Sequence, residues 1–325
     1  MNTIGLVVNP AAGKDIRRLV AYGSVFGNRE KINYTIRILL GFDQITTVPV
    51  KLVYMPDPYE LVETVIDEIG KSLKNIQFEK APIPVFGDEA DTTHFTQYIA
   101  KEPNVSALIV LGGDGTNRLV ARYSRKIPLF SISAGTNNVF ADDIEPTIFG
   151  MALGYFMNGW VKKDQVLERK KVLRIFQENI EKDIALVDVV FLDKKEIGAR
   201  AVWDSSLVKF VVVTQTDSMK TGLSAIVDRV VKISSQDHYG GYVFPNHSGR
   251  MVSVAIAPGL VQKIGIGEWG YLQENQSIPI NHTEGIIALD GERELPVRLG
   301  ENWTVLLDKN GPVKANIKQI MEQVR

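Results

Sequence analysis

The feature that most constrains this chain is a repeated alternation, in its first half, of continuous apolar runs with helical patterns. The runs read TIGLVV, KLVYM, APIPVF, ALIVL and IPLFSIS. Apolar strands separated by helices form a mostly parallel sheet that is covered on both faces and joined by right-handed crossovers. We therefore expect a doubly wound α/β domain over residues 1–160.

Beyond Trp160 the pattern changes to short strand-like runs, with one clear helical pattern at about residues 223–232. The runs read KVLRIFQ, IALVDVVFL, KFVVVTQ, MVSVAIAP, GIIALDG, ELPVRL and WTVLLD. This spacing predicts a β-rich second domain over residues 161–310. Residues 311–325 are helical in pattern and are a candidate to pack back on the first domain.

The charge balance and the residue usage exclude several classes of protein. There are 37 Lys and Arg residues against 38 Asp and Glu, so no global field attracts nucleic acid or an anionic membrane. The absence of cysteine excludes disulfides, thiolate catalysis and Cys-based metal sites. No run approaches the ~20 apolar residues of a membrane helix, and the start lacks the basic region of a signal peptide. We expect a cytoplasmic protein, with a homo-oligomer left open, that binds a small molecule.

Three unusual loops follow strand-like runs: NPAAGKD, GGDGTN and SAGTNNVFA. Ligands of open parallel sheets gather at the carboxyl ends of the strands. The three loops are therefore expected to converge in space, although they are far apart in the sequence.

The GGDGT loop carries the strongest chemical signal. Gly112, Gly113 and Gly115 would let backbone N–H groups approach a phosphate at a helix N-terminus, and Thr116 adds a hydroxyl and an N–H. Asp114 would repel a phosphate, so we expect it either to hold Mg²⁺ or to accept a proton from an attacking hydroxyl. Both roles belong to phosphoryl transfer. The alternative is that Asp114 only caps its helix.

The GTNN loop supplies a second candidate cradle. Gly135 and Thr136 would approach a phosphate, and Asn137 and Asn138 are neutral donors and acceptors that suit a ribose or an adenine edge. The alternative is an ordinary glycine turn.

The NPAAGK loop is not a Walker A loop, because the Gly-x₄-Gly-Lys spacing and the following Ser or Thr are missing. It still places Asn9, Gly13 and Lys14 between a strand and a helix, where a nucleotide phosphate would fit. Arg17 and Arg18 follow it, either as further phosphate contacts or as a solvated helix face.

For three segments of the second half, a purely structural role is at least as well supported by the sequence as a role in a binding site. Asp-Gly in LDGERE, between two strand-like runs, is typical of a hairpin turn. The segments DHYGGY and GIGEWGY are interpreted as glycine-aromatic loops that line an acceptor pocket or pack the core.

Taken together, NPAAGK, GGDGT, GTNNVFA and the late DGE resemble the NAD kinase and diacylglycerol kinase superfamily over nearly the whole chain. Within it, residues 9–42 resemble the start of the acetoin catabolism protein X family of predicted ATP-dependent NAD kinase relatives. The resemblance implies a two-domain fold, Asp114 as catalytic carboxylate, and nucleotide binding by the NPAAGK and GTNN loops. It also implies a metal site at the DGE match, formed by Asp290 and Glu292.

The function that this resemblance implies is phosphorylation of the 2′-hydroxyl of NAD or NADH, or of a related nucleotide, with ATP and Mg²⁺. The chain departs from many relatives after GGDGT: they continue with one residue and then Asn-Glu, where this chain has Asn117, Arg118 and Leu119. The alternatives are a lipid or small-alcohol kinase of the diacylglycerol kinase type and a non-catalytic nucleotide-sensing protein.

Overall fold

The computed structural model of the chain describes residues 1–13, 22, 25–135, 137–193, 205–280, 283–291 and 293–324. Of the residues singled out from the sequence, Lys14, Arg17, Arg18, Thr136 and Glu292 lie outside this description. The chain divides into two compact units. The first unit comprises Met1–Lys14, Phe26–Arg169 and Pro312–Arg325, and the second comprises Asp15–Val25 and Lys170–Gly311.

The first unit is built on a seven-stranded sheet with the strand order β3-β2-β1-β4-β5-β17-β6. The strands are β1 (Asn2–Val8), β2 (Val50–Tyr54), β3 (Ile76–Lys80), β4 (Val105–Gly112), β5 (Leu129–Ser133), β6 (Leu167–Arg169) and β17 (Val313–Ala315). Neighbours from β3 to β17 pair in parallel, and β6 pairs antiparallel to β17. The strand order reverses between β1 and β4, which is where sheets of this kind bind ligands.

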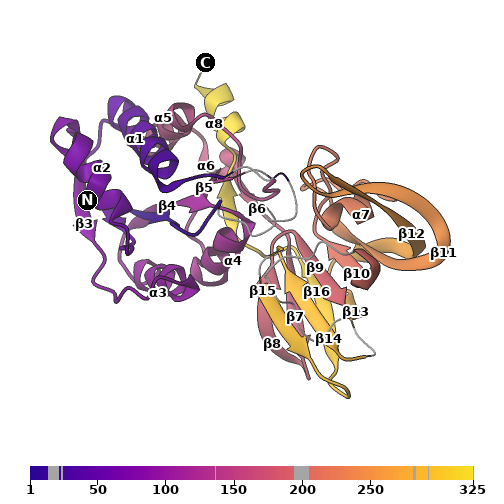
Figure 1. Ribbon diagram of the computed structural model, residues 1–325. Helices are drawn as coiled ribbons and strands as arrows, with labels where there is room; N and C mark the ends of the chain where they lie inside the picture. The colour runs from indigo at the N-terminus through magenta and orange to yellow at the C-terminus, as the bar shows by residue number, and fades with distance from the viewer. Residues whose placement is uncertain are drawn as a thin grey trace. The chain divides into compact units, whose positions relative to one another are not determined.

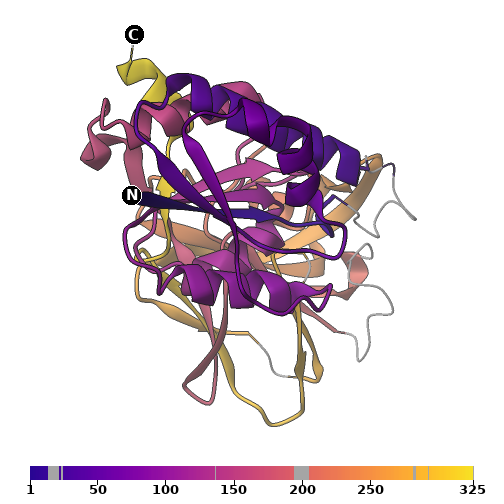
Figure 2. The ribbon, with the colours of Figure 1, turned by 90° about the vertical axis from the view of Figure 1, so that its left-hand side faces the viewer.

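Helices cover both faces of this sheet (Figures 1 and 2). They are α1 (Asn28–Ile45), α2 (Leu61–Ile69), α3 (Glu89–Ile99), α4 (Asp114–Tyr123), α5 (Pro146–Met157), α6 (Lys163–Val166) and α8 (Ile317–Gln323), with the 3₁₀ turn η2 (Gly70–Ser72). Helix α1 packs on α5 and α3 packs on α4, and α8 packs on α5 and α6. A Cβ at Gly150 of α5 would lie 2.0 Å from the Ile38 carbonyl oxygen of α1, so glycine allows this close packing. The arrangement confirms the predicted doubly wound α/β fold.

The second unit contains two antiparallel sheets, which confirms the predicted β-rich part of the fold. Their strand orders are β12-β11-β10-β9-β14-β15 and β13-β16-β7-β8. The strands are β7 (Val172–Gln177), β8 (Ile180–Ala185), β9 (Asp188–Leu192), β10 (Val208–Val213), β11 (Tyr239–Ala257), β12 (Leu260–Gln273), β13 (Ser277–Pro279), β14 (Gly285–Leu289), β15 (Arg293–Val297) and β16 (Trp303–Asp308). One core joins the two sheets through residues such as Phe191, Phe210 and Trp303. The other face of the larger sheet packs on α7 (Ser224–Asp228), and the 3₁₀ turn η3 (Ser205–Leu207) precedes β10.

Several predicted elements differ from the structure. The run APIPVF is not a strand; the edge strand β3 lies just before it, at Ile76–Lys80. DHYGGY and GIGEWGY are not loops, because their aromatic parts belong to the long strands β11 and β12. The helix predicted near residues 223–232 is only the five-residue α7, and the C-terminal stretch forms β17 before α8. No helix in the described ranges combines the length and apolar character needed to cross a membrane.

Candidate functional site

The loops that follow β1, β4 and β5 meet, as predicted. The Nδ2 group of Asn9 donates a hydrogen bond to Thr116 Oγ1 at 2.8 Å, which links the first loop to the second. A Cβ built on Gly135 would lie 3.5 Å from the Cα atom of Gly13, so the third loop touches the first. We call residues 9–13, 112–116, 133–135 and 137–141 the strand-end cradle. All of it belongs to the first unit.

The glycines of the cradle are needed first for contacts between its own loops. Gly13 has φ +70°, and a Cβ there would lie 2.5 Å from Phe26 Cβ and 2.8 Å from the Ala134 carbonyl oxygen. A Cβ on Gly112 would lie 2.7 Å from Thr116 Cβ. From the sequence, these glycines are predicted only to let a phosphate approach the backbone. Mutual packing of the loops is an additional reason for them.

Gly113, Gly115 and Gly135 complete the predicted glycine set. Gly113 is the N-cap of α4, and a Cβ on it would lie 3.1 Å from Asn138 Oδ1. Gly115 is buried in the first turn of α4. Gly135 has φ +152°, a conformation that strains any other residue.

Asp114 is held by the third loop. Its Oδ2 accepts a hydrogen bond from the Val139 N–H at 2.8 Å, and its Oδ1 accepts from the Phe140 and Ala141 N–H groups at 3.0 and 3.3 Å. Burial raises the pKa of the Asp114 carboxyl above its ordinary value, while the three N–H donors and the charge of Lys314 oppose that rise. The carboxylate therefore fixes the conformation of residues 139–141.

The polar side chains of the cradle bond mainly to one another. Asn138 Oδ1 accepts from the Asp114 N–H at 3.1 Å, and its Nδ2 donates to Ser133 Oγ at 2.7 Å. Ser133 Oγ in turn donates to the Gly135 carbonyl oxygen at 2.7 Å. Asn137 adopts a left-handed conformation with φ +84°. Asn138 thus braces the loop, a role that the sequence argument did not assign to it.

Two buried lysines near the cradle were missed by the sequence argument. Lys314 of β17 donates to the Phe140 carbonyl oxygen at 2.5 Å and to Asp142 Oδ1 at 2.7 Å. Lys31 of α1 donates to the Pro10 carbonyl oxygen at 2.7 Å, which supports the first loop. No local signal identifies Lys314, since a lysine between Val313 and Ala315 is also the ordinary alternation of a half-exposed strand.

Asp290 lies in the second unit, in the turn between β14 and β15, which pair as the predicted hairpin. Its carboxylate accepts hydrogen bonds from the N–H groups of Leu186, Val187 and Asp188 at 2.8 to 3.1 Å. Asp290 therefore anchors the turn to the start of β9. Within the described ranges, no group of three or more His, Asp or Glu side chains is arranged to hold a metal ion.

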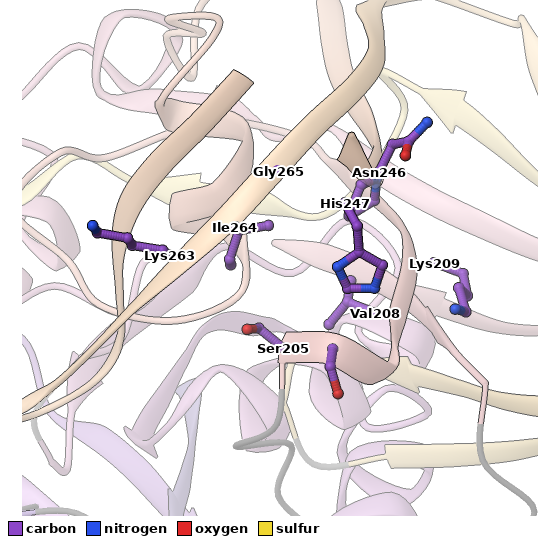
Figure 3. A pocket seen from close by; sticks show the side chains of 10 residues that line it. Ser205, Val208, Lys209, Asn246, His247, Lys263, Ile264 and Gly265 are labelled. Atoms are coloured by element: carbon purple, nitrogen blue, oxygen red, sulfur yellow. The ribbon is translucent and has the colours of Figure 1, made fainter. Parts of the chain in front are cut away.

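The second unit also has a pocket beside a bulge in β11 (Figure 3). Pro245 and Arg250 both pair with Ile266, so residues 246–249 form the bulge, which carries His247. A Cβ on Gly249 would lie 1.9 Å from the Ile266 carbonyl oxygen. The lining residues are Ser205, Ser206, Val208, Lys209, Pro245, Asn246, His247, Lys263, Ile264 and Gly265. Gly265 is the first residue of GIGEWGY, a segment that the sequence analysis interprets as lining an acceptor pocket or packing the core.

Comparison with known proteins divides the chain near the same point as the structure. Residues 4–161 match a family described as the ATP-NAD kinase N-terminal domain, and residues 171–310 match the acetoin catabolism protein X C-terminal domain. The chain is similar to acetoin catabolism protein X of Cupriavidus necator, with 30% identity over 318 residues. That similarity covers 94% of this chain and 87% of the relative.

Proposed function

The chain belongs to the family of acetoin catabolism protein X, and on that premise we propose that it is a kinase that transfers the γ-phosphoryl group of ATP to a nucleotide alcohol. The acceptor we propose is the 2′-hydroxyl of the adenosine ribose of NAD or NADH. The observation that carries the proposal is the strand-end cradle. It brings three loops together at the point where the strand order reverses, around the carboxylate of Asp114.

The start of α4 is the element best suited to the phosphates of ATP. Gly113 caps the helix without a side-chain hydrogen bond, and the helix runs for ten residues. The first amide groups of a helix lack partners inside it and carry partial positive charge, here at Gly115 and Thr116. Lys14 lies outside the described residues, and its assignment to a phosphate is a proposal from its place in the NPAAGK loop.

Asp114 would orient the acceptor hydroxyl and take its proton. Among the described residues, Oδ2 accepts one main-chain hydrogen bond, and a carboxylate oxygen has the capacity for two. Because burial raises the pKa of this carboxyl, Asp114 is a stronger base than an exposed aspartate once it has ionised. Oδ2 is therefore the atom we assign to proton transfer.

Mg²⁺ would enter with ATP and offset the charge of its phosphates. The bonds of Asp290 to three main-chain N–H groups do not favour it as a metal ligand. The assignment of Asp290 and Glu292 to the metal stays a proposal from family resemblance.

One rival is a protein of another class, which binds a nucleotide without turnover. A carboxylate that only fastens a loop needs no turnover, so the three bonds of Asp114 also suit a protein that senses a nucleotide. A lipid or small-alcohol kinase is the other rival. The nearly balanced charge of the chain offers no general attraction to an anionic membrane.

An acceptor panel tests the proposal. The purified chain is incubated with ATP and Mg²⁺ and with NAD, NADH, diacylglycerol or small alcohols, and products are read by mass spectrometry. We expect a phosphorylated dinucleotide. A phosphorylated lipid or alcohol alone would establish the rival kinase, and tight ATP binding without product from any acceptor would establish the sensor.

A further inference from the structure

Lys314 connects the end of the chain to the strand-end cradle. It lies in β17, the strand by which the chain returns to the first unit after the second unit is complete. Its backbone is fixed on both sides, since it pairs with Leu129 of β5 and with Glu168 of β6. Lys314 is only 7% exposed. Hydrogen bonds to the protein, rather than to solvent, therefore set the orientation of its ammonium group.

The partners of Lys314 are the residues that hold Asp114. The ammonium group donates to the carbonyl oxygen of Phe140, whose own N–H donates to Asp114 Oδ1. It also pairs with Asp142, which follows the loop and is fixed to β5 by hydrogen bonds with Ser131 and Ser133. One residue, Phe140, thus bonds to the lysine on one side and to the carboxylate on the other.

Stability alone does not account for a lysine at this position. Replacement of a buried ion pair by apolar side chains of similar volume is often neutral or stabilising. Leu or Met at position 314, together with an apolar residue at position 142, would remove the cost of burying the ammonium group. The ammonium group is instead directed at the carbonyl oxygen of the loop that carries the three N–H donors.

We propose that Lys314 is a positioning residue for Asp114: through Phe140 it sets the N–H groups that hold the carboxylate, and its positive charge acts on that carboxylate. The inference rests on the proposed function only in giving Asp114 a catalytic task. The electrostatics agree with the geometry, because the charge of Lys314 lowers the pKa of Asp114 against the effect of burial. Two other charged side chains meet beside this loop: Lys314, and Asp142, whose Oδ1 accepts a hydrogen bond from Lys314.

The test replaces Lys314 by Met and compares the variant with Lys171→Met. Lys171 is a matched control: it is 6% exposed, and it too donates to main-chain carbonyls, those of Ser234 and Tyr239 in the second unit. The readout is the titration of the Asp114 carboxyl, followed by ¹³C NMR. We expect the pKa of Asp114 to move upward in Lys314→Met and to stay at its wild-type position in Lys171→Met.

Turnover gives a second readout. If the chain is a kinase, Lys314→Met lowers kcat by roughly tenfold or more while KM for ATP changes little, and Lys314→Arg restores part of kcat. If Lys314→Met does not fold, Lys314→Gln removes the charge and keeps a donor for Phe140. An Asp114 titration that is unchanged in whichever neutral variant folds overturns the inference. A shifted titration in a chain without kinase activity leaves the inference standing and refutes only the proposed function.

Discussion

At the residue scale, Asp114 fastens residues 139–141 and is the base that we propose, and the variant Asp114→Asn tests both roles. We expect kcat to fall by roughly 100-fold or more, because the amide cannot accept the proton. We also expect the free energy of unfolding to fall by about 1.5–3 kcal/mol, since one main-chain N–H of residues 139–141 loses its charged acceptor. Initial rates and urea unfolding measure the two effects.

A matched control for this variant is Asp91→Asn. Asp91 is buried in the first unit and accepts hydrogen bonds from the N–H groups of Phe86 and Gly87, outside the cradle. It should lose stability on a similar scale and keep its activity. If Asp114→Asn retains activity within a few-fold of wild type, Asp114 is not the base.

Lys171 gives a pH-dependent prediction at the same scale. Burial lowers the pKa of its ammonium group from 10.5 to about 8, although Asp237 opposes that shift. Between these values the unfolded chain binds more protons than the folded chain, so the contribution of Lys171 to the free energy of unfolding rises with pH. The stability of wild type relative to Lys171→Met should therefore increase from about pH 8 to pH 10.5 in urea titrations, by at most about 1.36 kcal/mol per pH unit. A constant difference across this range would contradict the assignment.

At the scale of the elements, the packing of one loop against another is tested by two glycines of similar backbone geometry. Gly13 and Gly159 have φ values of +70° and +72°, but a Cβ on Gly159 meets nothing within 4 Å, whereas one on Gly13 would overlap Phe26 and Ala134. Gly159→Ala should cost about 1–2 kcal/mol for its backbone conformation. Gly13→Ala should cost about 1–3 kcal/mol more, from overpacking. Equal losses in urea unfolding would mean that the first loop does not depend on this contact.

The elements that sequence predicted well are those that one physical rule determines. TIGLVV and ALIVL are apolar because both faces of β1 and β4 are covered, so burial alone identifies them. Strand β3 has the polar sequence IQFEK and lies at the sheet edge, so its strand character depends on pairing with β2. The long strands β11 and β12 contain glycines, and these glycine-rich segments are predicted as loops from the sequence alone. They are extended because each pairs with the other, which no local pattern reports.

The residues of the candidate site also form two groups, those that a short motif predicts and those that depend on tertiary contacts. Strand-end glycines and the carboxylate of Asp114 were predictable because they occur together in a short motif. The bracing by Asn138 and the contact of Lys314 with Asp142 were not, since the latter pair is separated by 172 residues and depends on the return of β17 to the first sheet. These contacts are therefore visible only in the tertiary structure, because no sequence motif contains them.

At the scale of the whole molecule, family membership and the parallel sheet support a nucleotide kinase, but the acceptor depends on groups that no motif specifies. The missing Asn-Glu after GGDGT removes the usual sequence evidence for an adenosine contact. In the proposed function, the strand-end cradle would supply the phosphate contacts and the base. The identity of the alcohol is therefore the part of the account that most needs a measurement.

The most direct measurement is a quantitative product analysis after incubation of the chain with ATP, Mg²⁺ and NAD, with Asp114→Asn run in parallel. The account predicts equimolar ADP and 2′-phosphorylated NAD from the wild-type chain, and formation of both slowed by roughly 100-fold or more in the variant. ATP bound with neither product formed, or equal product from the wild-type chain and the variant, would contradict it.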